Sequence, residues 1–253
     1  MMISRYHDPG FDKDTISLCE RRPGPPERFG MTPRKVRASI SVPNGGFMQV
    51  PDSQSSPAKT RTFFVFAAWG IVIAPLTIVL HELGHYLAGL LMGTPDLALH
   101  YGSVSDTAAE RGFPPVKIGI QALAGPAVTL GIMTVCVFAL RKNPDHPVWL
   151  TAMFAAPVRF AVGAVYLYFA AMAAIQGIPP GQPNFDEFKA AQMLGFSVVP
   201  ILIAELALTV ALWSWAVGRL GKGIRFPALA GTAVGIISGI GLWIALLGPL
   251  LLP

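Results

Sequence analysis

The chain has 253 residues, of which 53% are hydrophobic and only 13% are charged. Soluble domains carry about 25% charged residues, so this composition excludes an ordinary soluble domain and predicts a membrane-embedded protein. The formal net charge of +5 is concentrated in the N-terminal region and in loops, where it reports membrane topology rather than nucleic-acid binding. Cys19 lies in a polar region and Cys136 in an apolar one, so no disulfide framework is expected.

The N-terminal region, residues 1–61, is polar and rich in Pro, Arg, Ser and Gly, without a periodic apolar pattern. Such a segment cannot bury enough apolar surface to fold, so we expect a disordered polar tail. Residues 62–253 are expected to form one membrane-embedded domain.

Five apolar stretches follow the tail, and a bilayer core needs about 20 residues per helix. They are approximately 62–92, 116–140, 148–176, 196–217 and 226–251. Leu97, Leu99 and Tyr101 alternate with other residues, which is the period of a strand and predicts a short hairpin over 97–103. The expected fold is an all-α polytopic membrane protein with about five transmembrane helices and a short β-hairpin after the first.

Positive charge is distributed unevenly among the connections. Ten Lys or Arg residues lie in 1–61, two in 141–147 and three in 218–225, whereas the opposite side of the membrane would receive only three. This excess places the tail and both basic turns in the cytoplasm. We expect an integral, multi-pass protein of a bacterial cytoplasmic membrane.

The first apolar stretch contains the sequence His81-Glu82-Leu-Gly-His85. Residues four apart lie on one face of a helix, so His81 and His85 can present two imidazoles to one metal ion. Glu82 projects beside them, where it can act as the general base on a metal-bound water, as in zinc hydrolases. A chance arrangement of buried histidines is the alternative, but ionisable groups at membrane depth are costly and favour a functional site.

A third ligand is expected elsewhere, because a catalytic zinc takes three protein ligands and leaves one position for water. Asp186 is the best candidate, since it follows the proline-rich stretch 178–184, where irregular backbone that lines a cavity is tolerated at membrane depth. Asp186 could instead cap the helix that begins there. Glu187 is the second choice, and His100 is a weaker one.

Two further ionisable residues lie within the apolar stretches. Arg159 is partway along the third stretch and Glu205 partway along the fourth. We expect them to pair with each other as a structural lock. The alternative is that one of them lines a water path to the metal.

Three segments resemble the site-2 protease family of intramembrane zinc metalloproteases. Residues 81–85 match the family's His-Glu-x-x-His motif. Residues 124–129 are similar to its Gly-Pro-x-x-Asn segment, and residues 178–192 are similar to its proline-rich loop that ends in Asp-Gly. The resemblance implies one Zn²⁺ ion held by His81, His85 and Asp186, with Glu82 as the catalytic base, and a small sheet beside the site. The family's zinc lies nearer the cytoplasmic face, which would put the tail outside, so both orientations stay open.

The resemblance implies a zinc-dependent endopeptidase that hydrolyses a peptide bond in or near a transmembrane segment of a membrane protein. Its partners would be that substrate and the lipid bilayer, without nucleic acid. Thr129 and Asn184 are the candidate contacts to the substrate backbone. Thr129 stands where the family usually has Asn, and Glu187 where Gly is usual, so the chain resembles a divergent, minimal member. An inactive relic that binds zinc, and a metal or ion transporter, are the alternatives.

Overall fold

The computed structural model describes residues 56–179, 181 and 183–252. Five of its helical segments are long and apolar enough to cross a membrane, which confirms the expected all-α polytopic fold. The chain is therefore a membrane protein. Most of the expected disordered tail lies outside the described residues, but residues 56–61 are helical. The first helix thus includes residues 56–61, ahead of the first apolar stretch.

Three of the spans are continuous helices. They are α1 (Ser56–Met92), α2 (Pro115–Lys142) and α6 (Val198–Arg219). Pro115 begins α2, because its fixed φ and missing N–H suit the first turn of a helix. Arg141 and Lys142 end α2, where their charges complement the negative end of the helix dipole.

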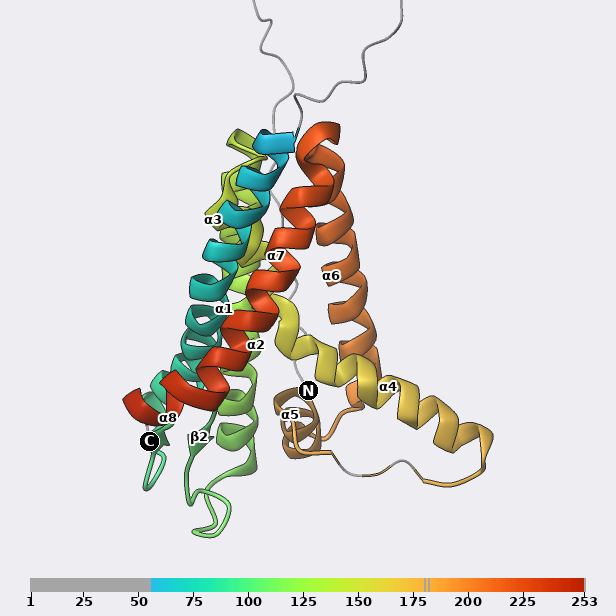
Figure 1. Cartoon of the computed structure of the whole chain (residues 1–253). Coiled ribbons are helices and arrows are strands. Elements are labelled where there is room, and N and C mark those ends of the chain that lie inside the picture. The colour runs from blue at the N-terminus through green and yellow to red at the C-terminus, as the bar shows by residue number, and fades with distance from the viewer. Residues whose placement is uncertain (1–55, 180, 182, 253) are drawn as a thin grey trace, which may run out of the picture. The chain divides into compact units, whose positions relative to one another are not determined.

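The third and fifth spans are interrupted. The third consists of α3 (Pro147–Ala155), the 3-10 helix η2 (Ala156–Arg159) and α4 (Phe160–Ile175), and the fifth consists of α7 (Lys222–Leu242), the π-helical turn η3 (Trp243–Leu247) and α8 (Gly248–Leu251). Pro157 lies in η2 and removes a backbone donor, which accounts for the change of direction between α3 and α4 (Figure 1). The short helix α5 (Asp186–Leu194) lies in the connection between α4 and α6.

The predicted β-hairpin is confirmed after α1. Strands β1 (Ala98–Leu99) and β2 (Val104–Ser105) pair antiparallel, and β2 lies just after the expected range of 97–103. The tip of the hairpin is held by the fifth span, because Trp243 Nε1 donates to the Tyr101 carbonyl at 2.8 Å. The Tyr101 N–H in turn donates to the Leu252 carbonyl at 3.2 Å.

The main core lies among α1, α2, α3, α7 and the second half of α6. Glycines on α7 bring its backbone against that of α1, since a Cβ added at Gly235 would lie 2.8 Å from the Gly70 Cα. Small residues allow such close helix packing in membranes. A second, smaller cluster of Ala191, Val198 and Leu202 joins α5 to the start of α6.

Candidate metal centre

Three donor atoms converge where α1 meets the start of α5. His81 and His85 lie one turn apart on α1, and their Nε2 atoms are 3.2 Å apart. The Asp186 Oδ2 atom lies 3.0 Å from the His81 Nε2 and 3.2 Å from the His85 Nε2. Both imidazoles are buried, whereas Asp186 is 33% exposed. Residues 105 positions apart in the chain thus form one cluster.

The spacing of these atoms fits a single metal ion. Ligands at tetrahedral angles and zinc-like bond lengths lie about 3.3 Å from one another, which is close to the separations in the cluster. Two imidazole nitrogens and a carboxylate oxygen at this distance repel one another unless a proton or a cation lies between them. The His81, His85 and Asp186 group could therefore bind a metal ion.

Each imidazole is oriented by a hydrogen bond at its other nitrogen. The His85 Nδ1 lies 2.8 Å from the Gln121 carbonyl, and the His81 Nδ1 lies 2.9 Å from the Thr129 Oγ1. A carbonyl only accepts, so the His85 Nδ1 carries the proton in this contact, and in the neutral ring the Nε2 then has a lone pair for a metal ion. Such partners fix the tautomer and ring orientation of metal-binding histidines.

Two glycines let α2 approach the motif on α1. A Cβ added at Gly84 would lie 2.8 Å from the Ala124 carbonyl oxygen, so glycine is needed where α1 meets α2. A Cβ added at Gly125 would lie 2.6 Å from the His81 Nε2. Gly125 therefore leaves open the space into which both imidazoles point.

The structure distinguishes among the expected third ligands. Asp186 is the first residue of α5, whose N-cap is Phe185, and no side-chain capping bond occurs there. Its carboxylate faces the imidazoles instead, which does not support the capping alternative. Glu187 is buried beside Asp186 but is not part of the three-residue cluster. The His100 Nε2 is 2.9 Å from the Ser105 Oγ within the hairpin, away from the cluster.

Asp186 and Glu187 differ in how their surroundings affect ionisation. Burial would raise the pKa of Asp186, but hydrogen bonds with the His81 and His85 imidazoles outweigh it and hold this pKa below its usual range. Burial raises the pKa of Glu187, and the neighbouring Asp186 charge adds to the effect. Asp186 is therefore the more readily ionised carboxyl and the better cation ligand.

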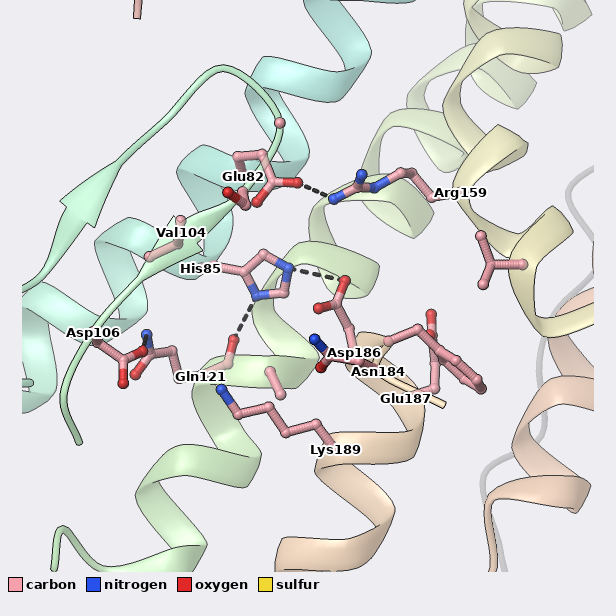
Figure 2. Close-up of a pocket in the computed structure, with 15 residues that line it drawn as sticks. Glu82, His85, Val104, Asp106, Gln121, Arg159, Asn184, Asp186, Glu187 and Lys189 are labelled. Carbon is pink, nitrogen blue, oxygen red and sulfur yellow. Dashed lines mark hydrogen bonds and ion pairs between the residues drawn. The ribbon is translucent and has the colours of Figure 1, made fainter. Parts of the chain in front are cut away.

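Glu82 is ion-paired with Arg159, which corrects the expected Arg159–Glu205 pair. The Arg159 Nη2 contacts the Glu82 Oε1 (Figure 2). Glu82 is 2% exposed, whereas Arg159 is 36% exposed. Glu205 keeps a buried Oε2 without a hydrogen-bond partner among the described residues. The sequence could not predict this pairing, because the relative depth of two spans depends on the break at η2.

A polar cavity of about 360 Å³ opens beside the cluster. Glu82, His85, Asp186 and Arg159 line it, together with the hairpin residues Ser103 and Val104. Of the two expected substrate contacts, Asn184 lines the cavity. Thr129 is 1% exposed and is bonded to His81, so its position favours a role in orienting the imidazole.

Sequence reasoning missed several residues around this cavity. Gln121 orients His85 through its carbonyl, accepts from Thr94 at 3.0 Å and donates to Asp106 at 3.1 Å. It thus ties α1, α2 and the hairpin together. A polar residue one turn before Gly125 in an apolar span was the signal that could have identified it. Lys189, the fourth residue of α5, also lines the cavity (Figure 2).

The geometry of this centre is the main guide to function. The chain matches no model of a known protein family, no curated protein and no solved structure.

Proposed function

We propose that this chain is a zinc-dependent intramembrane endopeptidase, resembling the site-2 proteases, that cleaves a membrane protein in or near a transmembrane segment. The observation that carries the proposal is the convergence of the Asp186 carboxylate on the two motif imidazoles, with Glu82 on the wall of the same cavity. A Glu directly after the first His is the arrangement that hydrolysis needs. A bacterial cytoplasmic membrane as its location is part of the proposal.

His81, His85 and Asp186 would hold the ion. Two nitrogens and one carboxylate oxygen form a donor set that suits zinc, and catalytic zinc sites use three protein ligands. When bound, zinc supplies Lewis-acid polarisation of the scissile carbonyl and lowers the pKa of water toward about 7.

Glu82 is placed to move the proton. Its carboxylate is buried beside His81 and faces the cavity, so it can accept a proton from the attacking water and later pass it to the leaving amine. Thr129 and the Gln121 carbonyl keep the two imidazoles in one orientation. This preorganisation lets the side chains act without rearrangement during the reaction.

The hairpin offers a surface for the substrate backbone. A transmembrane helix protects its peptide bonds with internal hydrogen bonds, so a substrate must unwind locally before it is cut. An unwound segment needs new backbone partners, and a strand edge supplies them. Val104 of β2 and Ser103 line the cavity, so a strand that pairs beside β2 would lie next to Glu82 and His85.

The first experiment measures the zinc content of the purified chain beside Asp186→Ala. We expect about one zinc per chain, falling sharply in Asp186→Ala, because a catalytic site takes three protein ligands. Asp145→Ala is the matched control, since Asp145 lies in the exposed turn between α2 and α3 and should leave zinc unchanged. Zinc retained without Asp186 would point to Glu187, and no zinc in the wild-type chain would contradict the proposal.

The second experiment tests hydrolysis. The zinc-loaded chain is reconstituted with a panel of single-span membrane peptides that carry helix-destabilising residues, and products are identified by mass spectrometry. Glu82→Gln should abolish cleavage while keeping zinc, whereas Glu110→Gln, an exposed control, should cleave normally. Cleavage that survives Glu82→Gln would rule out this mechanism.

A second candidate function is a zinc-binding membrane protein without hydrolytic activity. The Glu82–Arg159 ion pair favours it, because the guanidinium contacts a carboxylate oxygen that would otherwise be available to the attacking water. Zinc at one equivalent without cleavage of any panel peptide would support this second candidate.

A further inference from the structure

The guanidinium of Arg159 lies in an unusual place. Arg159 is the last residue of the 3-10 helix η2, and its side chain lines the cavity beside Glu82 (Figure 2). A charged residue within a membrane span is costly and marks a functional site. In Figure 2, Arg159 reaches Glu82 from the side of the third span, whereas His85 and Asp186 face each other on a different side of the cavity.

The Glu82 pair leaves part of the guanidinium available. Arginine has five N–H donors in a planar fork, and the contact with the Glu82 Oε1 is made from Nη2. The Arg159 side chain is 36% exposed and lines the cavity, whereas its partner is 2% exposed. The arginine therefore presents donors to whatever occupies the cavity, and its partner does not.

The other side-chain donors that line the cavity are engaged elsewhere or lie at its exposed rim, as Ser103 does. The Thr129 hydroxyl is buried and engaged with His81. The Gln121 amide donates to Asp106. Asn184 and Lys189 are exposed residues of the α4–α5 connection and of α5. Arg159 is the cavity-lining cation that directly contacts the proposed base.

We propose that Arg159 is a further catalytic residue of this site, which donates hydrogen bonds to the carbonyl oxygen of the scissile peptide as that oxygen becomes negative. The inference rests on the proposed function. It adds a residue that neither the motif nor the expected substrate contacts Thr129 and Asn184 include.

The reaction needs no reactant besides the peptide and one water molecule. The water oxygen forms a bond to the carbonyl carbon, the π electrons of the carbonyl move to its oxygen, and a water proton passes to Glu82. The C–N bond then breaks as the oxygen's electron pair re-forms the carbonyl, and the amine takes the proton from Glu82. Negative charge thus leaves Glu82 as it appears on the substrate oxygen, and the Arg159 guanidinium, in contact with Glu82, can follow it.

This transfer needs little rearrangement. The guanidinium lines the cavity while its Nη2 contacts the Glu82 Oε1, so its other N–H donors need not leave that contact to reach a substrate oxygen. Donors aimed at developing negative charge in a water-poor site act mainly on the transition state, and removing one typically costs about 10²–10³-fold in kcat. Arg159 should therefore affect kcat more than KM.

The test compares wild type, Arg159→Gln, Arg159→Lys and Arg159→Ala, all zinc-loaded, on a peptide that the wild type cleaves. We expect kcat to fall about 10²–10³-fold in Arg159→Gln, with KM within about threefold and zinc content unchanged. Arg159→Lys should be intermediate, because lysine keeps the charge but loses the fork. Arg111→Gln is the control, since Arg111 pairs with Asp96 on the exposed surface.

Chemical rescue separates catalysis from folding. Guanidinium chloride at millimolar concentration should restore at least about tenfold of the activity lost in Arg159→Ala, and should not affect Glu82→Gln. Three results for Arg159→Gln would overturn the inference and leave the proposed function standing. They are cleavage at the wild-type rate or faster, loss of zinc, and a rise in KM with kcat unchanged. Failure of guanidinium to rescue Arg159→Ala would also overturn it. A zinc-loaded wild type that cleaves nothing would instead overturn the proposed function.

Discussion

The two regions that meet at the metal centre are packed in different ways. In the packed region, made of α1, α2, α3 and α7, helices touch backbone to backbone: a Cβ added at Gly235 or Gly239 would lie 2.8 Å from a Cα of α1. In the open region, made of α4, α5 and the start of α6, a Cβ added at Gly163 would meet only the end of the flexible Leu202 side chain. Figure 1 shows α4 running away from α1, α2 and α7.

The metal centre is divided between these regions. The packed region contributes His81, His85 and Glu82, whose orientation α2 fixes through Thr129 and Gln121. The open region contributes Asp186, and η2, which joins α3 to α4, contributes Arg159. Close packing of α1 against α2 thus orients the imidazoles, and elements that follow α3 supply the charged groups Asp186 and Arg159.

The largest expected effect is on the space that the packed region leaves for the two imidazoles. Gly125→Ala would place a methyl group 2.6 Å from the His81 Nε2, so zinc affinity should fall by more than about 100-fold. Gly131→Ala on the same helix is the control, because no described atom lies within 4 Å of its added Cβ. Zinc titration of both variants checks this, and normal affinity in Gly125→Ala would mean that the imidazoles point elsewhere.

The packing contrast itself can be measured by paired glycine substitutions. Gly235→Ala forces backbone apart and should lower the free energy of unfolding by about 3 kcal/mol. Gly163→Ala displaces only a leucine side chain and should cost less than about 1 kcal/mol. Unfolding titrations in mixed micelles give both values, and equal losses would remove the distinction between the regions.

Zinc removal should loosen the open region selectively. An ion that binds only the folded chain stabilises it by about 2.7 kcal/mol at a hundredfold excess over its dissociation constant. A chelator should therefore speed hydrogen exchange in α4 and α5 while α1 and α7 exchange as before. Asp186→Ala should abolish the difference between the chelated and the zinc-loaded chain, and uniform loosening would contradict the division.

The smallest expected effect is on the orientation of one ligand. Thr129→Val removes the partner of the His81 Nδ1, which should lower zinc affinity about tenfold. The control is Thr134→Val on the same helix, whose hydroxyl bonds only its own turn at the Leu130 carbonyl among the described residues. Unchanged affinity in Thr129→Val would show that packing alone orients His81.

Much of the fold could be predicted because it follows from patterns within short stretches of the sequence. Spans of about 20 apolar residues and an alternating pattern over 97–103 are readable from short windows, and the structure has the spans and the hairpin. His81 and His85 follow from helix periodicity. Asp186 could be selected because few acidic residues lie outside the tail, and it does face both imidazoles.

The rest of the site depends on how the spans are placed against one another. Arg159 meets Glu82 rather than Glu205 because a 3-10 turn after Pro157 sets its depth and direction. Thr129 faces His81 because Gly84 and Gly125 let α2 approach. Neither contact is encoded in a periodic pattern, so sequence reasoning singled out Arg159 and Thr129 but not the side chains that they meet.

The two hydrogen bonds that hold the hairpin tip at Tyr101 affect the entropy of substrate binding. Two strands of two residues each are only marginally stable alone, yet the backbone of Tyr101 is held at its carbonyl by Trp243, 142 residues away, and at its N–H by Leu252. The rim of the cavity is therefore ordered when the chain folds. An extended peptide that adds beside β2 loses only its own conformational freedom, and its affinity is not reduced by the ordering of the loop that receives it.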